Sequence, residues 1–209
     1  MNFLVIEGNI GAGKTTLAEM ISKDYNAQLV SENFADNPFL KKFYNDPVNY
    51  AFTLEMSFMS ERYTQMVNEL QNRDLFKDFA VSDYYFMKSL IFASVTLSDD
   101  EFNLYRKFFN IIYPRLPKPD LFVFLYKNGT NLLKNIRKRG REYEQSIETD
   151  YLDKVTKAYF NFFKQQVDFP IVIIDTNDID FVENKKDYLK LCETIFQNTY
   201  DSGITRVLL

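Results

Sequence analysis

The stretch Gly8-Asn9-Ile10-Gly11-Ala12-Gly13-Lys14-Thr15 fits the pattern G-x-x-x-x-G-K-[ST] of a phosphate-binding loop. Ahead of it, the apolar run Phe3-Leu4-Val5-Ile6 is typical of a buried parallel strand. After it, Leu17, Met20 and Ile21 recur at helical spacing. Because the motif requires this order of strand, loop and helix, the sequence predicts a site for a nucleoside triphosphate.

Backbone N–H groups from Gly8 to Thr16 are expected to surround the phosphates, and the positive end of the following helix adds to their attraction. Lys14 is expected to neutralise charge on the β- and γ-phosphates, and the Thr15 hydroxyl to hold Mg²⁺.

Composition narrows the class of protein. The chain has 209 residues, 46% of them hydrophobic, which suits a single α/β domain spanning residues 1–209. No apolar run approaches the ~18 residues of a membrane span, and the net charge of −4 argues against an extended nucleic-acid surface. The single cysteine, Cys192, excludes an internal disulfide, so we expect a cytoplasmic protein with no membrane partner. Because the chain contains no histidine, acid–base chemistry falls to carboxylates first.

Two further predicted strands end at acids. The run Gln28–Ser31 is followed by Glu32, and the run Phe79–Ser82 is followed by Asp83. In parallel sheets the carboxyl ends of the strands form the edge where ligands bind. An acid after a strand near the phosphate-binding loop is suited to ordering Mg²⁺, so Asp83 is the second candidate metal residue.

Apolar runs at 121–125 and 169–174 complete a predicted parallel sheet of five strands with helices on both faces. Helices are expected at 50–70, 85–93, 99–113, 131–139, 150–167 and 185–198, whereas the tail from Thr199 suggests no element. The longest of these helices carries Glu55 and Arg62 seven residues apart, which places them close together on one face.

A basic cluster, Arg137-Lys138-Arg139-Gly140-Arg141, is closed by Glu142 and Glu144. A solvated helix end is the ordinary interpretation of such a run. In an acidic protein with a phosphate-binding loop, an arginine-rich lid over the triphosphate, at about 137–147, is the better interpretation.

The loop at 177–181, with Asn177 and Ile179, is expected to reach the nucleotide base. The sequence Asn184-Lys185-Lys186-Asp187 imitates a GTPase motif, but nine residues separate it from the strand and no D-x-x-G accompanies it.

Taken together, these stretches resemble the deoxyribonucleoside kinase family over nearly the whole chain. The resemblance rests on Glu32 after the second strand, on Tyr44-x-x-Pro47, Phe52-Thr53-Leu54-Glu55 and Arg62, and on Arg139-Gly140-Arg141-x-x-Glu144. It implies a P-loop kinase fold and transfer of phosphate from ATP, with Mg²⁺, to the 5′-hydroxyl of a deoxynucleoside. It also implies that Glu32 is the catalytic carboxylate, that Lys14, Arg139 and Arg141 stabilise the transferred phosphate, and that Tyr44 and Glu144 hold the sugar 3′-hydroxyl. Leu54, Glu55, Arg62, Lys88 and Phe92 would surround the rest of the nucleoside.

Two positions depart from the family pattern. Asp83 is followed by Tyr84-Tyr85 where the family has arginine and serine, and we expect Lys88 or a lid arginine to replace the missing charge. Glu55 stands where the family commonly has glutamine. Next to Arg62 we expect Glu55 to be ionised and to accept a hydrogen bond from the base, while Arg62 or Lys88 donates one. The bacterial branch that the chain resembles favours purines, so we expect deoxyadenosine first and deoxyguanosine second.

Two other functions remain open at this stage. A thymidylate kinase shares the fold but needs arginines for its acceptor's phosphate, and Tyr84 occupies one of those positions. A nucleotide-dependent switch or binding module is disfavoured by the missing D-x-x-G. The resemblance further implies a homodimer.

Overall fold

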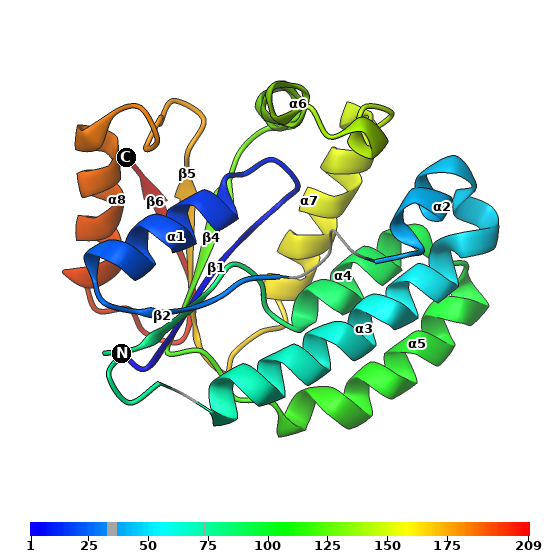
Figure 1. The fold of residues 1–209 in the computed structure, drawn as a ribbon, viewed down its shortest axis with the longest axis horizontal. Helices are drawn as coiled ribbons and strands as arrows, with labels where there is room; N and C mark the ends of the chain where they lie inside the picture. Colours follow the sequence, from blue (N-terminus) through cyan, green and yellow to red (C-terminus); the bar gives the residue numbers. More distant parts are fainter. Residues whose placement is uncertain (33–36, 73) are drawn as a thin grey trace.

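The computed structural model describes residues 1–32, 37–72 and 74–209. Over these residues the chain forms one parallel sheet of six strands in the order β2-β3-β1-β4-β5-β6 (Figure 1). The strands are β1 (Phe3–Gly8), β2 (Gln28–Val30), β3 (Ala80–Ser82), β4 (Leu121–Tyr126), β5 (Pro170–Asp175) and β6 (Gly203–Leu208).

Helices connect successive strands and cover both faces of the sheet (Figure 1). They are α1 (Lys14–Asp24), α2 (Leu40–Asn45), α3 (Pro47–Gln71), α4 (Met87–Thr96), α5 (Asp99–Ile112), α6 (Gly129–Arg139), α7 (Thr149–Phe163) and α8 (Lys185–Phe196), with short 3₁₀ turns at Tyr113–Arg115 and Glu142–Glu144. Over the described residues, none of the helices is long and apolar enough to cross a lipid bilayer.

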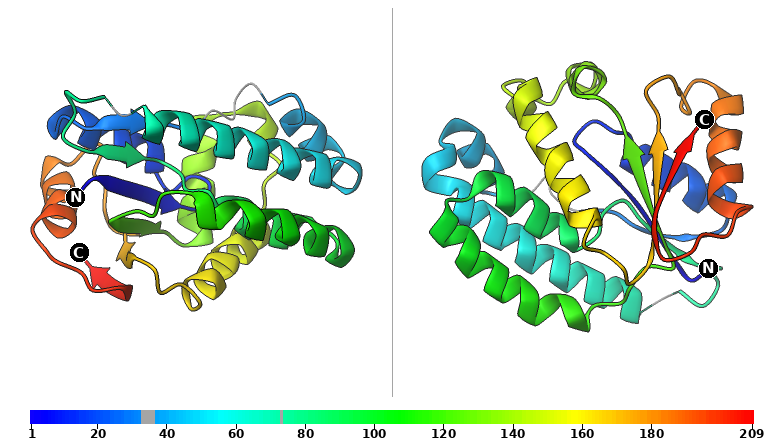
Figure 2. Two further views of the ribbon diagram at one scale, coloured as in Figure 1. Left: turned by 90° about the horizontal axis from the view of Figure 1, so that it is seen from below. Right: turned by 180° about the vertical axis from the view of Figure 1, so that it is seen from behind.

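Burial on both faces explains why β4 is apolar throughout. In β4, Phe122 and Phe124 face a core made with α3, α4, α5 and α7. The alternate residues, Val123 and Leu125, face a second core made with α1, α6 and α8. Figure 2 shows the sheet between these two groups of helices. Cys192 of α8 lies in the second core.

The expectation of five strands was wrong by one, because the tail forms β6, which pairs in parallel with β5. The run Ile204-Thr205-Arg206-Val207 contains no continuous apolar stretch, and its residues alternate between exposed and half-buried. With no fully buried residue, β6 lacks the apolar run that signals a strand covered on both faces.

The order of the strands brings three loops together. Because β3 lies between β1 and β2, Asp83 after β3 separates the phosphate-binding loop after β1 from Glu32 after β2. All three strands run in the same direction, so these loops meet at the carboxyl edge of the sheet.

Candidate active site

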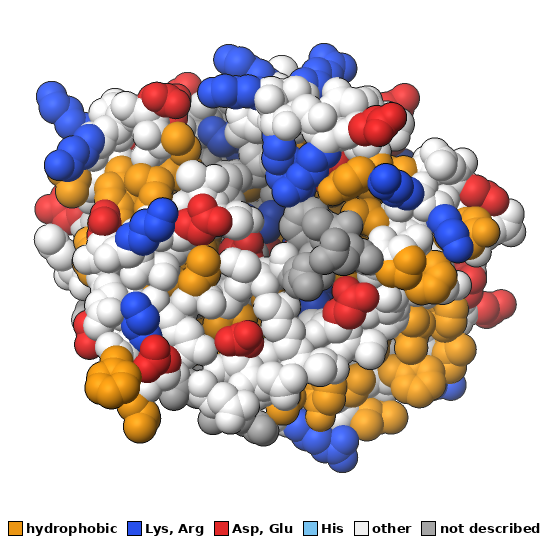
Figure 3. Space-filling model, in the orientation of Figure 1, with side chains coloured by type: hydrophobic (Ala, Val, Ile, Leu, Met, Phe, Trp, Pro, Cys, Tyr) orange, Lys and Arg blue, Asp and Glu red, His pale blue; other side chains and the backbone are white. Residues whose placement is uncertain are grey.

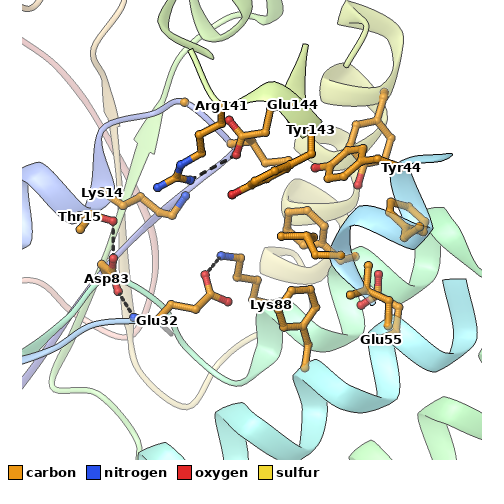
Figure 4. A pocket seen from close by; sticks show the side chains of 18 of the residues that line it. Lys14, Thr15, Glu32, Tyr44, Glu55, Asp83, Lys88, Arg141, Tyr143 and Glu144 are labelled. Atoms are coloured by element: carbon orange, nitrogen blue, oxygen red, sulfur yellow. Dashed lines mark hydrogen bonds and ion pairs between the residues drawn. The ribbon is translucent and has the colours of Figure 1, made fainter. Parts of the chain in front are cut away.

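A cleft at the carboxyl edge of the sheet has a volume of about 810 Å³, including its open mouth. Figure 4 shows the phosphate-binding loop at one end of the cleft and Glu55 at the other. The cleft is lined by Ile10, Gly11, Lys14, Thr15, Glu32, Leu40, Phe43, Tyr44, Leu54, Glu55, Phe58, Arg62, Asp83, Lys88, Phe92, Arg139, Arg141, Tyr143, Glu144 and Tyr151.

The phosphate-binding loop is shaped by its glycines and fixed from outside. Gly11 and Gly13 have φ of 83° and 92°, in the left-handed region that favours glycine. Asn9 anchors the loop to α7, because its Nδ2 donates to Leu152 O at 2.7 Å and to Thr156 Oγ1 at 2.8 Å. The loop is therefore held by a neighbouring helix before any ligand enters.

Lys14 lies within this loop with its ammonium group next to backbone oxygen. Its Nζ donates to Asn9 O at 3.0 Å. Burial, together with repulsion from Lys88, lowers the pKa of Lys14 to about 8. Two ammonium groups close enough to repel make a place where a polyanion is stabilised.

Thr15 and Asp83 lie in contact. The Thr15 hydroxyl donates to Asp83 Oδ2, and Asp83 Oδ1 accepts from the backbone N–H of Glu32 at 2.7 Å (Figure 4). Mg²⁺ is bound in proteins by one or two such oxygens, with water and substrate phosphates supplying the rest. These two side chains at the phosphate-binding loop therefore fit a Mg²⁺ ion that arrives with a nucleotide.

Glu32 is held by two cations in the centre of the cleft. Arg62 Nε donates to Glu32 Oε1 at 2.8 Å, and Lys88 is paired with Glu32 Oε2. Burial alone would raise the pKa of Glu32, but the charges of Lys88 and Arg62 outweigh it and lower the pKa to about 2. Glu32 is therefore a carboxylate throughout the neutral range.

The two residues after Asp83 bring no positive charge to the cleft. Tyr84 and Tyr85 are fully buried in the core under the sheet, and Tyr85 N donates to Glu7 Oε1 at 3.0 Å. The positive charges next to the Glu32 carboxylate come instead from Arg62 and Lys88. Lys88 was one of the two replacements expected from the sequence.

Glu55 differs from the expectation of an ionised acid beside Arg62. Arg62 directs its donors to Glu32 and to Ser89 Oγ, and among the described residues no hydrogen bond or ion pair joins it to Glu55. Burial raises the pKa of Glu55 to about 7, and the lowering effects of Arg62 and of the Thr96 hydrogen bond do not cancel it. The sequence prediction failed because helical spacing places two side chains on one face but does not determine which partner a guanidinium chooses.

The donors proposed for the base, Arg62 and Lys88, are both directed to Glu32 instead. Whether either of them also donates to a base stays a prediction.

The basic cluster contributes two arginines to the cleft. Arg139 and Arg141 both pair with Glu144, the latter at 3.3 Å, and Glu144 itself is buried. Tyr143 packs against Tyr44, with ring centroids 5.8 Å apart. Figure 3 shows basic side chains gathered over α6, beside the mouth of the cleft. Arg137, in contrast, is exposed on α6 and does not line the cleft.

The loop after β5 lies next to the phosphate-binding loop but outside the cleft lining. A methyl group added to Gly13 would come within 2.8 Å of Phe181 Cζ, so this loop packs directly on the glycine. The side chain of Asn177 accepts from Asn128 N at 2.9 Å and donates to Asp175, which ties the loop to the start of α6. Ile179 packs at the border of the second core. Contact of Asn177 and Ile179 with a nucleotide base stays a prediction.

The sequence reasoning missed several lining residues, among them Leu40, Phe43, Phe58, Tyr143 and Tyr151. It also missed Glu7, a fully buried acid that accepts from Gly8 N at 3.0 Å and from the Tyr159 hydroxyl at 2.9 Å. An acid inside an apolar strand, directly before the first glycine of the loop, was the available signal. The lining aromatics gave none, because they look like ordinary core residues.

Comparison with known proteins gives a consistent picture. Residues 4–200 match the family model described as deoxynucleoside kinase. The chain is 36% identical over 193 residues to the deoxyguanosine kinase of Bacillus subtilis, covering 90% of this chain and 93% of that protein. It is 31% identical to the deoxyadenosine kinase of Dictyostelium discoideum over 181 residues, covering 86% and 74% of the two chains.

A solved structure agrees with the fold. The deoxyadenosine kinase from M. mycoides with bound dATP superposes with a TM-score of 0.80 at 25% identity, covering 92% of this chain and 98% of that one.

Proposed function

The chain belongs to the deoxynucleoside kinase family, and on that premise we propose that it transfers the γ-phosphoryl group of ATP to the 5′-hydroxyl of a purine deoxynucleoside. One observation carries this proposal. A single cleft joins the phosphate-binding residues Lys14 and Thr15, through the ionised Glu32, to a buried polar group, Glu55, at its far end. Triphosphate, acceptor hydroxyl and base thus have separate positions along one path.

At the phosphate end, Lys14 and the lid arginines supply positive charge for the transferring group. Phosphoryl transfer passes through a loose transition state whose negative charge spreads over the equatorial oxygens, so fixed cations contribute most of the catalysis. Thr15 and Asp83 would hold the Mg²⁺ that accompanies ATP and neutralises its developing charge. Arg139 and Arg141 already line the cleft on the side chain of Glu144.

In the centre, Glu32 would receive the sugar 5′-hydroxyl. A carboxylate within hydrogen-bond reach orients the hydroxyl and accepts its proton as the new bond to phosphorus forms. Its low pKa keeps Glu32 ready as an acceptor at neutral pH. The positive charges of Arg62 and Lys88 also offset the negative charge of the carboxylate, which reduces its repulsion of the phosphates.

Between centre and far end, Tyr44 and Glu144 would bind the deoxyribose 3′-hydroxyl. Both line the cleft, and the ring of Tyr44 packs against that of Tyr143. Leu54 and Phe92 line the apolar walls around the base. A purine is supported by the names of the relatives, which are a deoxyguanosine kinase and a deoxyadenosine kinase.

A direct assay tests the proposal. The protein is incubated with ATP, Mg²⁺ and each of the four deoxynucleosides or dTMP, and the 5′-phosphorylated products are separated by chromatography. We expect 5′-monophosphates from the purine deoxynucleosides. Conversion of dTMP to dTDP with no product from deoxynucleosides would indicate a thymidylate kinase, and ATP binding with no transfer would indicate a switch or binding module.

We also propose that the chain acts as a homodimer. On α5, Leu104, Phe108 and Ile111 are exposed at helical spacing, and hydrophobic side chains gather over this helix in Figure 3. An exposed apolar stripe of this kind is typical of a surface that a partner covers. Sedimentation velocity of the wild type and of Phe108→Glu decides it, since a dimer should become a monomer in the variant.

A further inference from the structure

Glu55 combines deep burial with an unused hydrogen-bonding atom. The residue is 2% exposed and lines the far end of the cleft. Its Oε1 accepts from the Thr96 hydroxyl at 2.9 Å, whereas its Oε2 has no partner among the described residues. A buried polar atom without a partner is costly, so a group arriving in the cleft would gain by satisfying it.

Several titratable and charged groups face Glu55, and none of them neutralises it. From its own helix Arg62 acts on it, but the guanidinium is bound to Glu32 and Ser89. From the neighbouring elements the groups are Lys88 and Glu32, Tyr44, Tyr105, whose hydroxyl donates to the Glu55 backbone oxygen at 3.2 Å, and Tyr151. Burial dominates this balance and raises the pKa of Glu55 to about 7. Near neutral pH the side chain therefore exists in two forms.

The two forms have different hydrogen-bonding capacity. A carboxylate accepts only, whereas a carboxylic acid accepts at one oxygen and donates from the other, as a glutamine amide does. Oε1 already contacts the Thr96 hydroxyl, whose one proton is shared between Oε1 and Phe92 O at 3.0 Å, whereas Oε2 has no partner among the described residues, so we place the proton of the neutral acid on Oε2. The neutral acid would thus present an acceptor at Oε1 and a donor at Oε2.

Resting on the proposed function, we propose that Glu55 selects the base by its own protonation: the neutral acid admits adenine, cytosine or guanine, whereas the carboxylate admits guanine alone. Adenine and cytosine each offer an amino donor beside a ring-nitrogen acceptor, so they need one donor and one acceptor from the protein. Guanine offers two adjacent N–H donors, which the two oxygens of a carboxylate accept. It also offers a carbonyl acceptor beside one N–H donor, which suits the neutral acid.

The mismatched pair is the source of selection. A carboxylate facing the ring nitrogen of adenine brings two acceptors together and leaves both unpaired in a buried place. Deoxyadenosine should therefore use only the protonated fraction of the enzyme, while deoxyguanosine uses both fractions. The ratio of the two specificity constants becomes a readout of Glu55 protonation.

The test measures kcat/KM for deoxyadenosine and deoxyguanosine at pH 6, 7 and 8, in the wild type, in Glu55→Gln and in Thr96→Val. For a free-enzyme group titrating near pH 7, the protonated fraction falls about tenfold from pH 6 to pH 8. We expect the deoxyadenosine-to-deoxyguanosine ratio to fall by about that factor in the wild type. Taking a ratio removes pH effects on ATP, Lys14 and Glu32, which both substrates share.

The variants act as matched controls. Glutamine is neutral at every pH, so the ratio should stay flat in Glu55→Gln. Thr96→Val keeps the shape but removes a hydrogen bond that favours the ionised form, so the midpoint of the fall should move to higher pH. Deoxycytidine should follow the slope of deoxyadenosine, since it presents the same pair of groups.

The outcomes distinguish a failure of the Glu55 inference from a failure of the proposed function. A flat ratio in the wild type overturns this inference, and so does an equal slope in Glu55→Gln. If Glu55→Gln does not fold, an unshifted midpoint in Thr96→Val overturns it instead. Absence of transfer to every deoxynucleoside at every pH would refute the proposed function itself.

Discussion

Replacing Glu32 by glutamine removes the negative charge at the centre of the cleft and keeps the size of the side chain. Glutamine cannot accept the proton of the sugar hydroxyl, so kcat should fall ~10²–10⁴-fold at saturating substrates. Binding of the nucleoside should change little, because the base and the sugar 3′-hydroxyl are held elsewhere.

The same substitution has a calculable effect on stability. The pKa of Glu32 is lowered from its ordinary 4.5 to about 2 in the folded protein. At 1.36 kcal/mol per pH unit, this difference stabilises the native state by about 3 kcal/mol at pH 7. Because the folded pKa is depressed, the contribution is complete above pH ~4.5 and is lost as the pH falls toward 2. Roughly half of it remains at pH 3 by this relation.

Urea unfolding of the wild type and Glu32→Gln at pH 7 and pH 3 measures this contribution. The stability difference between the two proteins should narrow by about 2 kcal/mol at the lower pH, since glutamine does not titrate. Asp150→Asn is the control, because Asp150 pairs with Lys154 on the exposed surface of α7 at 2.6 Å. An exposed pair contributes little, so its difference should be small at both pH values. A Glu32→Gln difference independent of pH, or a kcat near that of the wild type, would refute the account of Glu32.

Four further substitutions, with Lys138→Ala as a control, test the phosphate end. Lys14→Ala should abolish ATP-dependent transfer, and activity retained at saturating ATP would contradict the role given to the loop lysine. Asp83→Asn should raise the Mg²⁺ concentration needed for half-maximal rate, as measured by titration with MgCl₂, and an unchanged requirement would remove Asp83 from the metal site. Arg139→Ala and Arg141→Ala should each lower kcat by orders of magnitude with little change in unfolding free energy. Lys138→Ala, from the same cluster, should leave kcat unchanged. Equal rates in all three variants would identify the cluster as solvated surface.

Much of the fold was predictable because parallel strands buried on both faces must be apolar throughout. The runs at 3–6 and 121–125 therefore marked β1 and β4 directly, and acids directly after such runs marked Glu32 and Asp83 as edge residues. Once the strands are parallel, their carboxyl ends must meet, so the assembly of the site followed from local patterns. β6 was missed because its residues alternate between half-buried and exposed, so it has no apolar run of this kind.

The side-chain partners were not predictable in the same way. Spacing along α3 brings Glu55 and Arg62 onto one face, but Glu32 approaches that face from a loop nearly thirty residues earlier. Which carboxylate pairs with the Arg62 guanidinium depends on how the helix and the loop that carry the two acids are placed in space. No local sequence pattern contains that information. The aromatic residues that line the cleft were not predicted for a related reason. Core positions and cleft positions on a helix use the same residue types.

The choice made by Arg62 accounts for both carboxylates of the cleft. A guanidinium donates in a fixed fork, and that of Arg62 is directed to Glu32 and Ser89; among the described residues it forms no hydrogen bond or ion pair with Glu55. With Lys88 added, Glu32 has two positive neighbours and a pKa of about 2, while Glu55 is buried without a paired cation and has a pKa of about 7. The acid proposed to accept a proton from the sugar is thereby held ionised. The acid proposed to recognise a base keeps both protonation states within reach, because both cations pair with Glu32.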